Sequence, residues 1–270
     1  MPRLDQVLVS RGLARSRTHA AKLIADGKVS TSGDVLSKAS QQVPEDVPID
    51  VQEHLEDAYV SRAGHKLAGA LAAFPDVVVQ GRRCLDAGAS TGGFTDVLLR
   101  QGAARVVAVD VGHGQLVPSL REDPRVEVHE GLNVRYMQPE QIGGPVNLTV
   151  ADLSFISLTL VLQPLAACTE PGGDLVLMVK PQFEVGRERL SRTGVVTSEH
   201  ERRRAVAQVA AAAVDAGLEL CGLASSPLPG QDGNVEYFLW IRRRIGDLLP
   251  KIEGRDAEVA ALLEMIWPNH

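Results

Sequence analysis

The stretch from Cys84 to Thr95, CLDAGASTGGFT, constrains the fold of this chain more than any other part of the sequence. It begins with an apolar run that ends in Asp86, continues with a turn rich in glycine and serine, and leads into apolar residues at helical spacing. This pattern predicts a buried strand, a tight loop and a helix. A glycine-rich connection lets the backbone approach a ligand closely, and the amide groups that open the helix can meet a carboxylate or a ribose hydroxyl.

A second apolar strand ends in a carboxylate at the spacing found in nucleotide-binding sheets. Residues 105–110, RVVAVD, end in Asp110, roughly 20 residues after the glycines, where dinucleotide-binding folds hold a ribose. A glycine-rich turn alone is a weak signal, because it also occurs as a plain strand–helix connection. The acidic strand end favours an adenosine site.

The spacing of the glycines bears on which adenosine compound binds. The loop lacks the GxGxxG pattern that suits a pyrophosphate, and the sequence contains no GxxxxGK[ST] loop. S-adenosylmethionine carries no phosphate and therefore fits better than NAD or ATP. We expect it to be bound by Asp86, Gly88, Ala89, Ser90, Gly92, Gly93, Phe94, Thr95, Asp110, Val111, Asn133 and Asp152.

Strand-like and helix-like segments alternate over the rest of the chain. Five further strands are expected at residues 126–129, 146–152, 174–180, 219–223 and 235–241, and Ser198 with Glu201 predicts the start of a long helix. The alternation predicts an α/β fold with a doubly wound, Rossmann-like sheet of seven strands. The carboxyl ends of parallel strands meet at one edge, so the polar residues that end these strands should lie together.

The first fifth of the chain has an organisation of its own. Apolar spacing predicts two short helices that end at Gly12 and Gly27, followed by a turn at Ser32-Gly33 and short extended segments. We therefore expect a small α+β domain over residues 1–56, a linker over 57–62 and the α/β domain over 63–270.

Charge is distributed unevenly, although the net charge of −6 by itself gives no sign of a nucleic-acid partner. The first domain is basic and the segment 45–57 carries only acidic charges. Arg15, His19 and Lys22 fall on one side of the second helix, where they form either a solvated surface or a phosphate-binding one.

Other functional classes lack sequence support. The three cysteines are far apart in apolar surroundings, which argues against a disulfide or a zinc site, so we expect no metal. No run of about 18 apolar residues and no signal-type start is present. We expect a cytoplasmic protein without a membrane partner.

The first domain resembles the small RNA-binding domain named after ribosomal protein S4, through LDQVLVSRGLARSR at 4–17 and IADGKV at 24–29. The resemblance implies binding to structured RNA. We assign this role to Arg3, Arg11, Arg15, Arg17, Lys22 and Lys28, and a guiding role at the second domain to Arg62 and Arg187, with Arg189 and Arg192 beside it.

Four residues of the second domain match, in order, the Lys-Asp-Lys-Glu tetrad of the FtsJ-like ribose 2′-O-methyltransferases: Lys66, Asp152, Lys180 and Glu236. Nearly the whole chain resembles the TlyA family, through DAGASTGGF at 86–94, ADLSFIS at 151–157, VKPQFE at 179–184 and GNVEYF at 233–238. Ala63 stands where that family is expected to have a glycine.

The resemblance implies transfer of a methyl group from S-adenosylmethionine to the 2′-hydroxyl of a cytidine in ribosomal RNA, within ribosomal subunits and without an obligate protein partner. Lys180 would act as the base. Two alternatives remain at this point, a non-catalytic RNA-binding factor in ribosome assembly and a membrane-active haemolysin, a label that members of this family often carry. Phe155 could stack on a base or serve only in packing.

Overall fold

The computed structural model describes residues 1–14, 17–51, 59–186, 188, 190, 193–246 and 254–268 of the chain. The chain forms two compact units, Met1–Ala58 and Tyr59–His270. Residues 59–62, which we expected in a linker, pack on the second unit, where the Val60 N–H donates a hydrogen bond of 2.9 Å to the Asp96 carboxylate.

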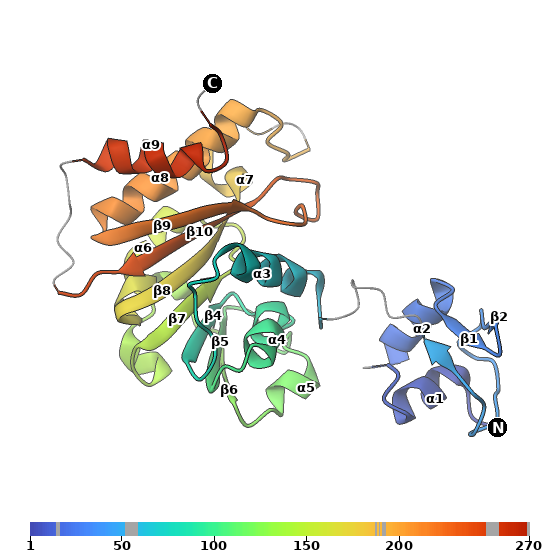
Figure 1. Ribbon diagram of the computed structural model, residues 1–270. Coiled ribbons are helices and arrows are strands. Elements are labelled where there is room, and N and C mark those ends of the chain that lie inside the picture. Colours follow the sequence, from blue (N-terminus) through green and yellow to red (C-terminus); the bar gives the residue numbers. More distant parts are fainter. Residues whose placement is uncertain are drawn as a thin grey trace. The chain divides into compact units, whose positions relative to one another are not determined.

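The first unit is a small α+β domain, drawn in blue in Figure 1. Its helices are α1 (Leu4–Ser10) and α2 (Arg17–Ala25), and its antiparallel sheet has the order β2-β1-β3, with β1 at Val29–Thr31, β2 at Asp34–Val35 and β3 at Asp50–Val51. The predicted helix ends and the turn at Ser32-Gly33 all adopt positive φ values, between 50° and 92°. Leu4, Leu8, Leu23 and Ile24 are buried at the centre of this unit.

The second unit contains the predicted seven-stranded sheet, in the order β6-β5-β4-β7-β8-β10-β9. Among these strands, β10 runs opposite to the other six, which are parallel to one another. The strands are β4 (Arg83–Ala87), β5 (Arg105–Asp110), β6 (Val126–Glu130), β7 (Val146–Ala151), β8 (Thr169–Val179), β9 (Leu218–Ser225) and β10 (Tyr237–Arg243).

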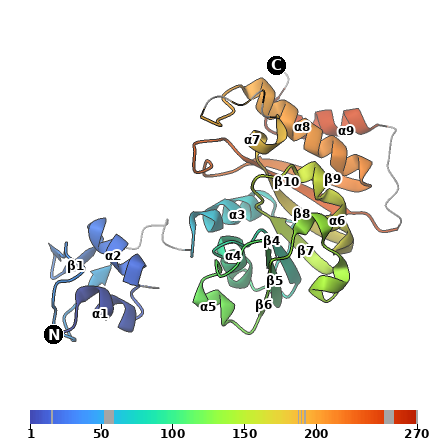
Figure 2. The same ribbon diagram turned by 180° about the vertical axis from the view of Figure 1, so that it is seen from behind.

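Helices cover both faces of this sheet (Figures 1 and 2). One face packs against α3 (Arg62–Ala73), α4 (Gly93–Arg100) and α5 (Pro118–Arg121), and the other against α6 (Leu162–Ala167), α8 (Glu199–Asp215) and α9 (Arg255–Glu264). The remaining helical segments are α7 (Pro181–Glu184), η2 (Val134–Tyr136), η3 (Pro139–Ile142) and η4 (Leu158–Leu160). No helix in the described part of the chain has the length and apolar character needed to cross a membrane.

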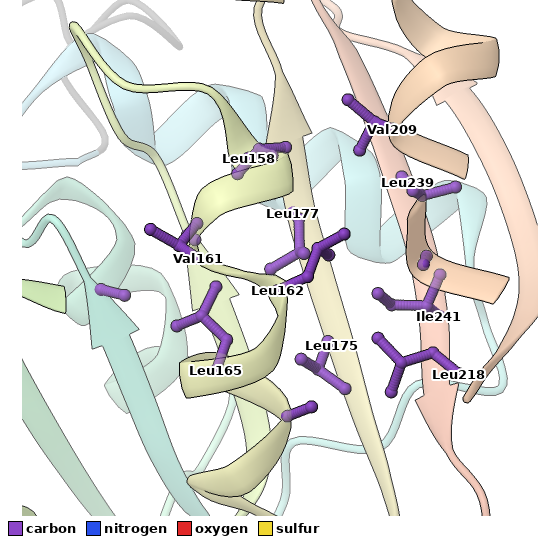
Figure 3. Close-up of a cluster of buried hydrophobic side chains, with 14 of the residues drawn as sticks. Leu158, Val161, Leu162, Leu165, Leu175, Leu177, Val209, Leu218, Leu239 and Ile241 are labelled. Carbon is purple, nitrogen blue, oxygen red and sulfur yellow. The ribbon is translucent and has the colours of Figure 1, made fainter. Parts of the chain in front are cut away.

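Alternating apolar residues attach the strands to both helical layers. In β8, Leu175 and Leu177 face one buried cluster, whereas Val176 and Met178 face the other. Figure 3 shows the first cluster, in which side chains of α6 and α8 meet those of β8 and β10. Full burial of each such side chain contributes about 1.5–3 kcal/mol, so the two layers hold the sheet, and with it the positions of the strand ends.

The antiparallel direction of β10 decides what lies at the functional edge. Tyr237, the first residue of β10, pairs with Val179, the last residue of β8. Glu236 therefore reaches the same edge of the sheet as Lys180. The strand starts at Tyr237, two residues later than expected from the sequence.

Candidate functional site

The loop after β4 is shaped by close backbone approaches. Gly88 has a φ of 88°, and a Cβ atom at this position would lie 2.7 Å from the carbonyl oxygen of Asp152. The Asp110 carboxylate, at the end of β5, accepts hydrogen bonds from the Ser90 N–H at 2.8 Å and the Gly112 N–H at 2.7 Å. This single side chain thus connects the loops after β4 and β5.

A pocket of about 550 Å³, here called the glycine-loop pocket, opens beside these loops. It is lined by Gly88, Ser90, Asp110, Val111, Gln115, Leu132, Asn133, Val134, Asp152, Leu153, Ser154, Phe155, Ile156 and Val161. These lining residues include two carboxylates and several apolar side chains but no lysine or arginine. An adenosine compound with a cationic group and no phosphate fits this electrostatic environment, which agrees with S-adenosylmethionine.

The structure brings half of the predicted cofactor residues to this pocket. Those that line it are Gly88, Ser90, Asp110, Val111, Asn133 and Asp152. Those that do not are Asp86, Ala89, Gly92, Gly93, Phe94 and Thr95. In this second group, Asp86 lies near the end of β4, Ala89 and Gly92 lie in the loop, and the other three open α4.

Asp86 shows this supporting role most clearly. Its side chain is fully buried, and its carboxylate accepts a hydrogen bond of 2.6 Å from the Thr95 hydroxyl. Burial raises the pKa of Asp86 to about 7, because desolvation disfavours the charged carboxylate. The hydrogen bond ties β4 to the first turn of α4.

Gln115 is a lining residue that sequence reasoning missed. The Ser90 hydroxyl lies 3.2 Å from Gln115 Oε1 and donates to it, so a side chain of the loop after β5 closes on the glycine-rich loop. No sequence signal marked Gln115, because it lies in a polar loop without periodicity.

A second pocket of about 760 Å³, here called the lysine pocket, adjoins the first. The two share Ser154, Phe155 and Ile156. The other residues that line it are Lys66, Ser157, Lys180, Gln182, Phe183, Gly186, Leu190, Gly194, Gly230, Gln231, Asp232, Asn234 and Glu236.

The four residues of the predicted tetrad form two ion pairs at these pockets. Lys66 Nζ lies 2.6 Å from Glu236 Oε2, and Lys180 Nζ lies 2.6 Å from Asp152 Oδ1. Each lysine side chain is only 11% exposed. Because Asp152 lines the glycine-loop pocket and Lys180 lines the lysine pocket, their ion pair connects the two. Lys180 also donates a hydrogen bond of 2.9 Å to Ser154 Oγ.

Phe155 stands at the boundary between the pockets. It is 90% exposed and has a φ of 64°, which is unusual for a bulky residue. Its ring centroid lies 5.3 Å from that of Phe183. Such exposure excludes a role for Phe155 in the buried core of the unit.

In the first unit, two of the predicted RNA-binding arginines converge on one acid. The Arg3 and Arg17 guanidinium groups each approach the buried Asp5 carboxylate at 3.0 Å. The hydrogen bond from Arg3 is the main reason why the pKa of Asp5 is lowered to about 2. The shared Asp5 carboxylate thus brings the guanidinium groups of Arg3 and Arg17 together.

The other basic residues of the prediction are more dispersed. Arg11 donates to the Val47 carbonyl oxygen at 2.6 Å, Lys28 lies 3.9 Å from Asp26, and Lys22 is exposed. In the second unit, Arg62 is exposed as the first residue of α3. The remaining predicted arginines lie outside the described residues: Arg15, Arg187, Arg189 and Arg192.

Metal chemistry finds no structural support in the described ranges. Among these residues, no group of three or more His, Cys, Asp or Glu side chains is placed to hold a metal ion.

Both units match known protein families. Residues 59–243 match the FtsJ-like methyltransferase family, and residues 2–49 match the S4 domain. The chain is 52% identical to the 16S/23S rRNA (cytidine-2′-O)-methyltransferase TlyA of Mycobacterium tuberculosis, over 97% of each chain. It is 36% identical to Hemolysin A of Brachyspira hyodysenteriae, over 87% of this chain and 98% of that one.

A solved structure supports the same comparison. A protein from Streptococcus thermophilus, described as a candidate hemolysin, superimposes with a TM-score of 0.70 at 37% identity. The match covers 96% of this chain and 94% of that one.

Proposed function

This chain belongs to the TlyA proteins of the FtsJ-like methyltransferase family, and we propose that it methylates the ribose 2′-hydroxyl of a cytidine in ribosomal RNA. The adjacency of the two pockets carries this proposal. The Lys180–Asp152 ion pair lies at their boundary, where a methyl donor in one pocket meets a nucleotide in the other.

The residues of the glycine-loop pocket suit the donor. S-adenosylmethionine supplies a methyl group activated by its sulfonium charge. Asp110 is placed to accept hydrogen bonds from the ribose hydroxyls of the donor, while Gly88 leaves room for its approach. Asn133, which also caps η2 through a 3.0 Å hydrogen bond from the Arg135 N–H, is placed near the adenine.

The residues of the lysine pocket suit the acceptor. A ribose hydroxyl is a weak nucleophile, so it needs a base and a fixed orientation. Lys180, once uncharged, would accept the hydroxyl proton as the oxygen bonds to the methyl carbon. The bond between that carbon and the donor's sulfonium sulfur would break, and S-adenosylhomocysteine would leave. Asp152 and Ser154 orient Lys180, and Glu236 orients Lys66.

The substrate assignment draws on named relatives. The Mycobacterium tuberculosis protein is named for action on 16S and 23S rRNA, and a Campylobacter jejuni relative, 32% identical, for action on 23S rRNA. The S4 domain of this chain supports an RNA substrate. We propose ribosomal RNA within ribosomal subunits as the partner. Its proposed contacts are Arg3, Arg11, Arg17, Lys22, Lys28 and Arg62, together with the undescribed Arg15 and Arg187.

The deciding experiment measures methyl transfer from labelled S-adenosylmethionine to unmodified ribosomal subunits, with the product located by primer extension that is sensitive to ribose methylation. Lys180→Met should lower the rate of transfer by about 10²–10⁴-fold, the usual contribution of a positioned base. The affinity for S-adenosylmethionine should change less than threefold, because Lys180 lines only the lysine pocket.

A matched control comes from the exposed Arg255–Asp215 ion pair, with an N–O distance of 3.0 Å. Arg255→Met removes a cation of a surface pair and should leave the transfer rate unchanged. Equal rates for wild type and Lys180→Met would refute the proposed role of Lys180. No transfer to either subunit by the wild type would refute the proposed function.

RNA binding by the first unit is tested separately. Replacing Arg11 and Lys22 together with alanine should weaken RNA affinity and reduce the slope of log affinity against log salt by about 2, if each contacts one phosphate. Filter binding at several salt concentrations measures this slope, and Arg105→Ala in the second unit is the control. An unchanged slope would contradict phosphate binding by these residues.

A further inference from the structure

The Glu236 carboxylate contacts a second polar side chain, Gln182, in addition to its ion pair with Lys66. Its Oε2 lies 2.6 Å from Lys66 Nζ, and its Oε1 accepts a hydrogen bond of 3.3 Å from Gln182 Nε2. The Glu236 side chain is only 3% exposed. An ionised carboxylate can only accept hydrogen bonds, so the Gln182 amide must present its nitrogen, and its orientation is determined.

Gly230 packs closely against this carboxylate. A Cβ atom at Gly230 would lie 2.7 Å from Glu236 Oε1 and 3.2 Å from its Cδ. Gly230 is not among the glycines with positive φ, so its backbone conformation would accept alanine. The reason for glycine at this position is therefore the space that the Glu236 carboxylate occupies.

Asn234 holds the turn that places Gly230. The Asn234 carbonyl oxygen accepts a 2.8 Å hydrogen bond from the Gly230 N–H. Its side chain accepts from the Val196 N–H at 2.9 Å and donates to the Gly194 carbonyl oxygen at 3.2 Å. Since Asn234 is only 2% exposed, the turn is anchored to the neighbouring segment and Gly230 has little freedom to move away.

We propose that Gln182 and Gly230 are positioning residues, which hold the Glu236 carboxylate and through it the Lys66 ammonium at the lysine pocket. This inference rests on the proposed function and adds two residues to its machinery. They act through Glu236, without a required contact to the RNA. A displacement of about 1 Å in such a group can cost on the order of 10² in rate.

Two substitutions test the proposal by steady-state methyl transfer. Gly230→Ala pushes the carboxylate away, and Gln182→Leu removes the hydrogen-bond donor at similar size. Each should lower kcat by about 10–100-fold, with less than threefold change in KM for ribosomal subunits and in Kd for S-adenosylmethionine. Gly222→Ala is the control, because its new methyl group would meet Phe74 at 3.0 Å, away from both pockets. Its kcat should stay within twofold of the wild type.

A double-mutant cycle separates positioning from direct RNA contact. In Glu236→Ala the new methyl group of Gly230→Ala meets no carboxylate, so adding Gly230→Ala should cause less than a twofold further loss in single-turnover rate. Gly230→Ala should lower the Tm in the wild-type background, because its methyl group would meet the Glu236 carboxylate. This lowering should disappear in the Glu236→Ala background.

Two outcomes would overturn the proposal: additive effects of the two substitutions on rate and Tm, or a loss that appears mainly in KM. The proposed function fails differently, through the absence of methyl transfer by the wild type. In that case the Tm cycle still decides whether Gly230 constrains Glu236.

Discussion

The two adjoining pockets of the second unit are built in different ways. In the glycine-loop pocket, Asp110 accepts hydrogen bonds from the backbone amides of Gly112, two residues away, and of Ser90, 20 residues away. In the lysine pocket, Lys66 and Glu236 form an ion pair across 170 residues of chain. The first site thus depends on the loops that follow neighbouring parallel strands, whereas the second depends on the packing of a helix against a strand that lies 170 residues further along the chain.

The pockets also differ in their charges. The glycine-loop pocket is lined by two carboxylates and no lysine or arginine among its described lining residues, although Asp152 pairs with Lys180 of the adjoining pocket. The lysine pocket is lined by two lysines, and Lys66 pairs there with the buried Glu236. In the proposed function, the cationic donor binds beside the carboxylates of Asp110 and Asp152. The acceptor binds beside Lys66 and Lys180, which are positioned by their ion pairs with Glu236 and Asp152.

The largest effect is expected from breaking the long-range ion pair between Lys66 and Glu236. Lys66→Met leaves Glu236 buried without its cation and should reduce the free energy of unfolding by about 3 kcal/mol, together with loss of methyl transfer. Urea unfolding measures the first effect. Adding Glu236→Leu should recover most of the stability but none of the transfer. If Lys66→Met alone kept full stability, the packing of the lysine pocket would not depend on this pair.

The next effect is the pH dependence of stability that arises from Asp86, the buried residue near the end of β4. The pKa of Asp86 is about 7 in the folded protein, above its value of about 3.9 in the unfolded chain. The Asp86 carboxyl therefore stays protonated to a higher pH in the folded state than in the unfolded chain. As the pH rises from 4 to beyond 7, its ionisation should lower the free energy of unfolding by about 2–4 kcal/mol.

Asp86→Asn should flatten this decline, because asparagine does not ionise and can still accept the Thr95 hydrogen bond. Unfolding by urea at pH 5 and pH 8 compares the two proteins. Since Asp86 does not line the glycine-loop pocket, affinity for S-adenosylmethionine should change less than threefold. A large loss of affinity with unchanged pH dependence would assign Asp86 directly to donor binding.

The smallest effect concerns the glycine-loop pocket alone. Asp110→Ala removes a charged hydrogen-bond acceptor and should weaken S-adenosylmethionine binding by about 10–100-fold, as expected for 1.5–3 kcal/mol. Isothermal titration calorimetry measures this change, with RNA affinity as the reference. If RNA affinity fell equally, the two pockets would not be separable in function.

Much of the fold was predictable because its signals are local. Apolar runs, the glycine-rich loop and the pattern at Ser198 and Glu201 predicted the strands, the first loop and the helix α8, whose Ser198 cap accepts a 3.4 Å hydrogen bond from the Glu201 N–H. The tetrad was identified by resemblance, since the spacing of Lys66 and Glu236 alone does not bring them together. Gly230 and Gln115 carried no signal of either kind, and Gln182 lay within the resembling segment 179–184 without a role assigned to it.

The sequence by itself determined the elements and the chemistry available at their ends, because hydrophobic periodicity and turn residues act over a few neighbouring positions. It also determined that an acid or a lysine ends or directly follows three strands, at residues 110, 152 and 180. Only the tertiary structure decided that β10 runs antiparallel, which places Glu236 at the same edge as Lys180. It also decided that Asp86 is buried and Asp110 is not, because burial depends on which segments pack over a residue, and those segments are distant in the chain.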